Sequence, residues 1–297
     1  MKIYKVLPDL SKERHMRIWH KALHAQWSAS DLPWSEPKRL TDRHLLDQLG
    51  RMLTPVLMGE QAALYSVSGL IPILGKMSQV ESQFYLTTWA VDEARHTELF
   101  TRFYHRIDRE PLPIRRFPAG YLFQSAIVSE DPAEWLSGVL VSEVIAKKLM
   151  EEFRRLDLDP LLSKIADGIL LDEARHLGFN HIYVEDEMRQ LYLEAEDRGE
   201  ARAAHLHEHL QGVLAALPPM LDALAGELRD VGIDRVELYE KVGEEAARRL
   251  SKSIEAGRRL GRRAENGEAI DPMRHADAGE ASRYAELLGA EMDRADA

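Results

Sequence analysis

The pentapeptide Asp-Glu-Ala-Arg-His occurs twice in the sequence. Residues three positions apart lie on the same face of an α-helix. In a helix, Glu93 and His96 would therefore point to one place, and Glu173 and His176 would do the same. A carboxylate and an imidazole that meet at one point form a mixed oxygen and nitrogen ligand set, which suits iron or manganese. Each copy therefore predicts part of a metal site.

A further glutamate precedes each copy by about thirty residues and lies within an apolar stripe of helical spacing. Burial of a lone carboxylate is costly unless it is paired or bound to metal. Four buried acids in one bundle would repel one another, and two divalent cations would remove that conflict. Two Glu-x-x-His helices plus one Glu from each of two other helices form the di-metal arrangement of ferritin-like bundles. We therefore predict six catalytic metal ligands: Glu60, Glu93, His96, Glu143, Glu173 and His176.

The competing interpretation is a duplicated surface helix whose charges are solvated. That interpretation would leave Glu60 and Glu143 on apolar stripes without an explanation. The aspartates that open the two pentapeptides, Asp92 and Asp172, are expected to accept the N–H of a ligand histidine across the core. A solvated or salt-bridged aspartate is the alternative. The arginines of the two copies are expected to point away from the metals and to form surface ion pairs.

Several side chains share the ligand-bearing faces of these helices and could form the wall of a substrate pocket or simply pack in the core. Lys147 either points into that pocket or extends its charged end to the surface. The alternating histidines 205, 207 and 209 do not share one helical face, so we interpret them as solvated. The candidate pocket residues are Ala63, Val67, Trp89, Phe100, Phe103, Lys147 and Met150.

Composition narrows the class of protein. The 297-residue chain is 45% hydrophobic and 30% charged, as in an ordinary folded protein. Its net charge of -11 argues against binding to nucleic acid or to an anionic membrane. The absence of cysteine excludes disulfides, zinc–thiolate sites, iron–sulfur clusters and cysteine nucleophiles. We find no signal peptide and no long uncharged apolar run, so we expect a cytoplasmic protein without a membrane span.

Helical periodicity dominates the sequence, and no β-type alternation is sustained, which predicts an all-α protein. The first ligand-bearing segment turns helical from Thr41 and is expected to be interrupted by the glycines and proline of residues 69–75. The second is expected to open with Ser78 and Glu81 as a capping box and to end near Ile107.

The third and fourth ligand-bearing helices begin with the same signal. Asp131-Pro132 and Asp159-Pro160 each place an aspartate at the cap and a proline in the first turn. Later helices are expected to break at Pro218-Pro219 and to restart at Asp234. We predict one ferritin-like domain, a four-helix bundle core with additional N- and C-terminal helices. Its parts are a 1–40 N-terminal arm, a 41–190 di-metal core, 191–262 accessory helices and a 263–297 polar tail.

The order Glu…DEARH…Glu…DEARH over residues 60–176 resembles the ferritin-like di-iron carboxylate superfamily, within it the ribonucleotide-reductase-small-subunit-like branch. The arm HAQWSASDLPWS is similar to the segment before the first metal helix in that branch. The resemblance implies two iron ions, or one Mn and one Fe, with O2 as co-substrate. It also implies an external electron donor and a homodimer. By the same resemblance, Glu60, Glu93 and His96 would bind one metal, and Glu143, Glu173 and His176 would bind the other. Glu93 and Glu173 would bridge the two metals.

Three positions distinguish the members of this branch. The radical tyrosine of the reductase subunit corresponds to Phe100, and Tyr104 lies a further turn away. The Val–Tyr cross-link of some ligand-binding oxidases corresponds to Ala63 and Gly138. The seventh ligand, a histidine, of the para-aminobenzoate N-oxygenases corresponds to Ile169. These departures favour a six-ligand centre without a cross-link.

The resemblance implies an O2-activating oxygenase or oxidase that acts on a small organic substrate by hydroxylation, desaturation or N-oxygenation. One alternative is a radical-generating subunit of a larger enzyme, against which Phe100 counts unless the metals are mixed. Another alternative is ferroxidase or iron-storage activity. The additional helices after residue 200 argue against storage, because storage cages use shorter chains.

Overall fold

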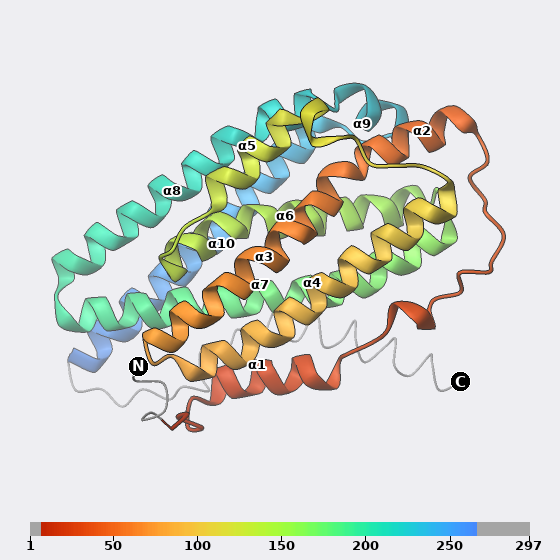
Figure 1. Cartoon of the computed structure of the whole chain (residues 1–297). Coiled ribbons are helices and arrows are strands. Elements are labelled where there is room, and N and C mark those ends of the chain that lie inside the picture. Colours follow the sequence, from red (N-terminus) through yellow and green to blue (C-terminus); the bar gives the residue numbers. More distant parts are fainter. Residues whose placement is uncertain (1–6, 266–297) are drawn as a thin grey trace.

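The computed structural model describes residues 7–265, and every regular element among them is a helix. Four long helices form the core of the molecule, and Figure 1 shows α3 and α4 side by side in front of α6 and α7. The prediction of an all-α, ferritin-like bundle is therefore confirmed. The core helices are α3 (Thr54–Lys76), α4 (Val80–Ile107), α6 (Pro132–Leu156) and α7 (Pro160–Glu194).

Further helices surround this core. Helix α1 packs on α4 and α7, whereas α8 and α10 pack on the other side against α6 and α7. Helix α5 lies between α3 and α8. These elements are α1 (Glu13–His24), α2 (Arg43–Met52), α5 (Pro118–Ile127), α8 (Glu196–Asp222), α9 (Ala225–Val231) and α10 (Arg235–Glu265), with the 3-10 turns η2 (Ala29–Asp31) and η3 (Ile114–Arg116).

The starts of α6 and α7 follow their predicted signals. The Asp131 carboxylate accepts a hydrogen bond from the Glu134 backbone N–H at 2.9 Å, and Asp159 accepts one from Leu161 at 3.0 Å. Proline follows each cap, where its missing N–H has no intrahelical partner to lose. These two starts set where the third and fourth ligand helices begin.

The expected interruption of the first ligand helix is wrong. Helix α3 continues through Gly69 and Pro72 to Lys76. Pro72 lies on the exposed side of the helix, where the carbonyl oxygen that loses its partner can bond to water. Burial of Leu70 and Leu74 on the opposite side keeps the helix continuous.

The expected capping box at Ser78 is also wrong. Ser78 adopts a left-handed conformation, with φ of 63°, in the turn that ends α3. Its backbone N–H donates to Gly75 and that of Gln79 donates to Leu74. Glu81 is buried in the first turn of α4 and accepts a hydrogen bond from the N-terminal segment, at the backbone N–H of Asp9. The turn between α3 and α4 is therefore set by backbone bonds.

Two expectations beyond the core need correction or restriction. Helix α8 passes through Pro218-Pro219 and ends at Asp222, because Leu217, Met220 and Leu221 remain buried on its inner side. The restart at Asp234 is confirmed, since its carboxylate accepts hydrogen bonds from the first turn of α10. Most of the predicted polar tail lies outside the described residues, and the division of the chain into four parts stays a prediction.

One helical stretch, Arg43–Lys76, is long and apolar enough to cross a membrane by length and composition alone. Its larger part, α3, packs along α4 and carries the buried carboxylate of Glu60. Core helices of soluble proteins pass the same test. The stretch is therefore weak support for a membrane span.

Candidate metal centre

The structure brings the six predicted ligand residues together in the middle of the bundle. Helix α3 supplies one glutamate and α4 supplies a Glu-x-x-His pair. In the same way, α6 supplies one glutamate and α7 supplies the second Glu-x-x-His pair. Glu60 and Glu143 lie on the predicted apolar stripes and are each 4% exposed. Both DEARH histidines are completely buried. The interpretation of a duplicated surface helix requires these residues to lie at the solvent boundary. All six are buried, so that interpretation is wrong.

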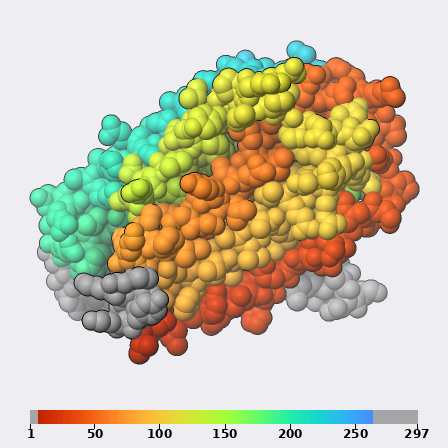
Figure 2. Space-filling model, viewed as in Figure 1, coloured from red at the N-terminus to blue at the C-terminus, as the bar shows by residue number. Residues whose placement is uncertain are grey.

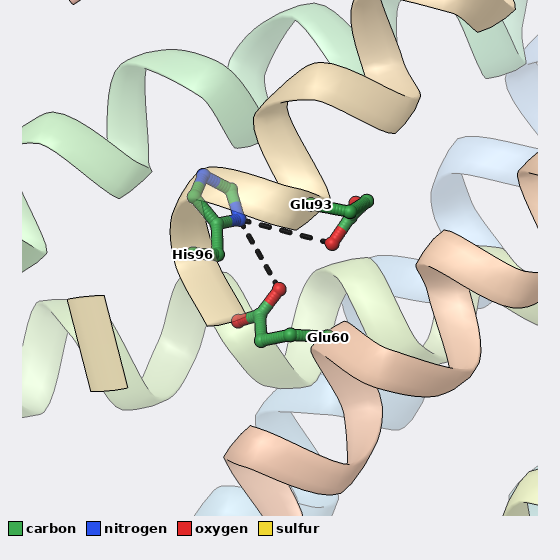
Figure 3. A group of neighbouring side chains, drawn as sticks. All are labelled: Glu60, Glu93 and His96. Carbon is green, nitrogen blue, oxygen red and sulfur yellow. Dashed lines mark hydrogen bonds and ion pairs between the residues drawn. The ribbon is translucent and has the colours of Figure 1, made fainter. Parts of the chain in front are cut away.

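The first group joins α3 and α4. The His96 Nδ1 atom lies 3.1 Å from Glu60 Oε2 and 3.8 Å from Glu93 Oε2 (Figure 3). The second group joins α6 and α7, where His176 Nδ1 lies 3.1 Å from Glu143 Oε2. Both histidines therefore turn the same ring nitrogen toward the carboxylates.

Two glutamates occupy the centre of this arrangement. Glu93 also places its second oxygen, Oε1, 3.5 Å from His176 Nδ1. Glu173 lies 3.8 Å from His96 Nδ1 through Oε1 and 3.6 Å from His176 Nδ1 through Oε2. Each of these two carboxylates thus reaches both histidines, whereas the outer glutamates are each paired with one. This symmetry suits Glu93 and Glu173 as the two carboxylates that would bridge a pair of metal ions.

Where cations are lacking, the electrostatics of the centre favour protons on Glu93, Glu173 and His96. Burial raises the pKa of Glu93 well above its ordinary value, and the charge of Glu60 adds to that rise. Burial and the charge of Glu143 act likewise on the pKa of Glu173. For His96, burial lowers the pKa, but the carboxylate of Glu60 outweighs it and holds the pKa well above normal. Divalent cations would displace these protons on binding.

Two observations indicate that these residues could bind divalent cations. Donor atoms of Glu60, Glu93 and His96 lie within 4.8 Å of one another, and so do those of Glu93, Glu143 and His176. The buried Oε2 atoms of Glu93 and Glu173 have no hydrogen-bond partner among the described residues. Buried oxygens without a partner are costly. Carboxylate and imidazole donors at this spacing are suited to two iron or manganese ions.

The two aspartates of the repeats meet the opposite histidines. Asp172 Oδ2 lies 3.0 Å from His96 Nε2, and Asp92 Oδ2 lies 3.4 Å from His176 Nε2. An N–H at Nε2 that donates to a carboxylate leaves Nδ1 with a free lone pair for a metal. The predicted partnership across the core is therefore a hydrogen bond between Asp172 and His96. Asp92 and His176 lie within ion-pair distance, and the His176 Nε2 atom has no hydrogen-bond partner among the described residues.

The expectation of surface arginines is wrong. Arg95 is buried and pairs with Asp92 and with Asp172, the latter at 2.8 Å. Arg175 pairs with the same two aspartates. The two aspartates face each other across the core and need countercharges there. Each arginine lies one helical turn after the aspartate of its own motif and reaches both carboxylates. Burial raises the pKa of Asp172, but the hydrogen bond from His96 and both arginines outweigh it, so that pKa lies well below its ordinary value.

The N-terminal arm closes this side of the centre. The Trp27 indole N–H donates to Asp172 Oδ2 at 3.0 Å, and the Gln26 amide donates to Asp92 Oδ1 at 3.0 Å. The Arg95 guanidinium stacks over the Trp27 ring, 4.9 Å from its centroid. This arm was identified in the sequence by its resemblance to the segment before the first metal helix, but these partners were not predicted.

Trp89 supports the centre through contacts with two ligand side chains. Its indole N–H donates to Glu93 Oε1 at 2.6 Å, and its ring stacks on His176 with centroids 4.4 Å apart. Tyr85 and Phe179 extend this aromatic layer, stacking at 4.5 Å. The Tyr85 hydroxyl has no hydrogen-bond partner among the described residues, and burial raises its pKa.

A cavity of about 50 Å³ borders the centre. All four ligand glutamates line it, together with apolar side chains of α3, α6, α8 and α9. Of the candidate pocket residues, only Ala63 lines this cavity. The others are buried side chains that pack elsewhere in the core, and they are Val67, Trp89, Phe100, Phe103, Lys147 and Met150.

Lys147 needs a separate correction. Its ammonium lies 2.8 Å from Glu245 Oε1 on α10 and 3.5 Å from Glu151 Oε1. The partner on α10 could not be foreseen, because nothing in the sequence shows which helix covers that side of α6. Two polar lining residues, Gln124 and Ser142, were also missed. Helix α5, which carries Gln124, was not predicted, whereas Ser142 lies on the predicted helix α6 directly before Glu143.

The position of the radical tyrosine in reductase subunits carries Phe100, which is completely buried. Tyr104, one turn later, donates its hydroxyl to the Gly50 carbonyl oxygen at 2.6 Å. That bond directs Tyr104 toward the end of α2, away from the ligand glutamates of the bundle centre.

Comparison with known proteins gives one family match. Residues 73–206 match the sequence model of a family described as P-aminobenzoate N-oxygenase AurF. That range contains both DEARH copies and Glu143 but not Glu60. No curated protein matches the chain.

Solved structures match over most of the chain. An R2-like ligand-binding oxidase with an aerobically reconstituted metal cofactor after photoconversion has a TM-score of 0.64 at 17% identity, covering 85% of this chain and 97% of that chain. A structure of an R2-like ligand-binding oxidase with a Mn/Fe cofactor has a TM-score of 0.62 at 17% identity, covering 85% and 96%. At this identity the likeness is one of fold, and the predicted resemblance to an R2-like, ferritin-like fold is confirmed.

Proposed function

We propose that this protein is an O2-using oxidase or oxygenase with two iron ions, or one manganese and one iron, and that it acts on a small organic substrate. The observation that carries the proposal is the pair of three-residue donor groups that share Glu93 and border a cavity. Structural relatives named as ligand-binding oxidases and the N-oxygenase family match support the same chemistry.

Bound metals would supply the electrons that reduce O2. The protein's own residues prepare the site for them. Hydrogen bonds from His96 to Asp172 and from Trp89 to Glu93 hold the ligand side chains in place. The apolar lining of the cavity excludes water from the side of the centre that faces the substrate.

The reaction is hydroxylation, desaturation or N-oxygenation, each of which needs electrons from an external donor unless the substrate supplies them. We further propose that the protein is cytoplasmic, works as a homodimer and binds neither nucleic acid nor membrane. The net charge of -11 supports the last point.

Metal removal tests the proposal. Protein loaded with Fe(II) and supplied with ascorbate as reductant should consume O2 at least about tenfold faster than metal-free protein, because only the loaded centre can pass electrons to O2. An oxygen electrode measures the rate. Zinc-loaded protein is the matched control, since zinc occupies similar ligands without redox chemistry. Equal rates for iron-loaded, zinc-loaded and metal-free protein would contradict the proposal.

A further inference from the structure

Two hollows meet at a common wall beside the metal centre. The inner one is the cavity of about 50 Å³ that the ligand glutamates line. The outer one is a groove of about 520 Å³ between α3, α5, η3 and α6. Ala63, Gln124 and Ser142 line both. Figure 2 shows α3 and α5 together on the face of the molecule where the groove lies.

Neither hollow offers a positive charge among the described residues. The inner lining contains no charged side chain except the four glutamates, and the outer lining contains none. Two divalent cations would balance the four carboxylates without leaving a net positive charge. A charged group that enters a dry site without a countercharge is strongly disfavoured. The site therefore selects against both anionic and cationic substrate groups.

The shared wall does offer hydrogen bonds. The structure shows no hydrogen bond from the Gln124 amide or the Ser142 hydroxyl to any described residue, and both side chains are partly buried. The Gln124 Nε2 atom lies 3.7 Å from the position that a Cβ on Gly59 would take, directly before Glu60. Gln124 therefore places a donor and an acceptor next to the helix segment that carries an outer ligand.

We infer that Gln124 and Ser142 recognise the substrate, an uncharged molecule with an apolar body and one hydrogen-bonding group. This inference rests on the proposed function. The apolar body occupies the outer groove, whose volume exceeds that of the inner cavity. The hydrogen-bonding group lies at the shared wall, and the reacting end extends toward the four glutamates. Buried polar groups that match the substrate give discrimination, because a mismatched group leaves them without partners.

Binding of three matched probes tests the inference. We would titrate 4-butylbenzyl alcohol, 4-butylbenzoate and 4-butylbenzylammonium into the iron-loaded protein without O2, using calorimetry. We expect the alcohol to bind at least about tenfold more tightly than either charged probe, since only the charged groups lose solvation without gaining a countercharge. Equal or tighter binding of the benzoate would overturn the inference.

Variants assign the effect to the shared wall. Gln124→Leu and Ser142→Ala should each weaken binding of the alcohol by about threefold to tenfold, the range for loss of one hydrogen bond. The matched controls are Gln211→Leu and Ser68→Ala, which change the same residue types at exposed positions outside both linings and should leave binding unchanged. Gln124→Arg should favour the benzoate, because it adds the missing countercharge. Unchanged binding in Gln124→Leu and Ser142→Ala would also overturn the inference.

The binding experiment needs no turnover, so it separates this inference from the proposed function. If iron-loaded protein consumes O2 and yet prefers the benzoate, the inference fails and the proposed function stands. If the alcohol is preferred and the iron-loaded protein consumes no O2, the recognition site stands and the proposed function fails.

Discussion

The Glu93→Gln variant is expected to lose at least one of its two metal ions and at least about 100-fold of its O2 consumption, since both depend on a carboxylate shared by two sites. Glu93 belongs to both groups of donor atoms and reaches both histidines. Glutamine keeps the shape of the side chain and can still accept the hydrogen bond from Trp89, but it removes the negative charge. Plasma mass spectrometry measures metal content, and an oxygen electrode measures the rate.

The thermal midpoint of the metal-free variant distinguishes loss of metal from loss of fold. We expect it to equal or exceed that of the metal-free parent, because a buried acid that neighbouring charges destabilise has been neutralised. Glu98→Gln on the exposed side of α4 is the matched control and should retain both metals. Full metal content in Glu93→Gln would contradict a bridging role for Glu93.

The Arg95→Met variant is expected to lower the free energy of unfolding by about 3 kcal/mol, the cost of removing one partner from a buried ion pair. Arg95 is buried and pairs with both aspartates that hold the ligand histidines. Methionine retains much of the side-chain volume, so the effect reports the lost charge. Urea unfolding of the metal-free protein measures the change.

A surface arginine on the same helix provides the comparison. Arg102 pairs with Glu98 and is 43% exposed, so Arg102→Met should cost less than about 1 kcal/mol. Arg95→Met should also weaken metal binding by about tenfold or more, because the aspartates would no longer be held against the histidines. The role that we assign to Arg95 is wrong if the two variants unfold at the same urea concentration.

The ligand positions were predictable because they depend on local geometry. A helix brings residues three apart to one side whatever surrounds it, so each DEARH copy had to present its glutamate and histidine together. The Asp-Pro starts of α6 and α7 were equally local, since a cap needs only its own first turn. The apolar stripes around Glu60 and Glu143 supplied the remaining information, namely that these acids face the core.

The arginine positions were not predictable in the same way. Helical spacing shows that Arg95 and Arg175 point away from the ligand glutamates, but it does not show what lies in that direction. The structure places α4 and α7 so closely that the reverse sides of both motifs share one buried ion-pair network. That proximity is a tertiary property of the bundle.

Prolines and glycines were overweighted as breaks in helices. Pro72 and Pro218-Pro219 remain inside helices because the apolar residues around them are buried against neighbours. Tertiary burial outweighs the local cost when the freed carbonyl group can reach water. Helix α5, which carries Gln124, was missed for a different reason. A short apolar helix gives little periodicity to detect.

A crystal structure of the protein as purified, with anomalous data at the iron and manganese edges, tests the central claim most directly. The account predicts two anomalous peaks within coordination distance of Glu93 and Glu173. One peak should also contact Glu60 and His96, and the other should contact Glu143 and His176. A protein with metals at other residues, or one that binds no metal at these six when soaked with Fe(II), would contradict it.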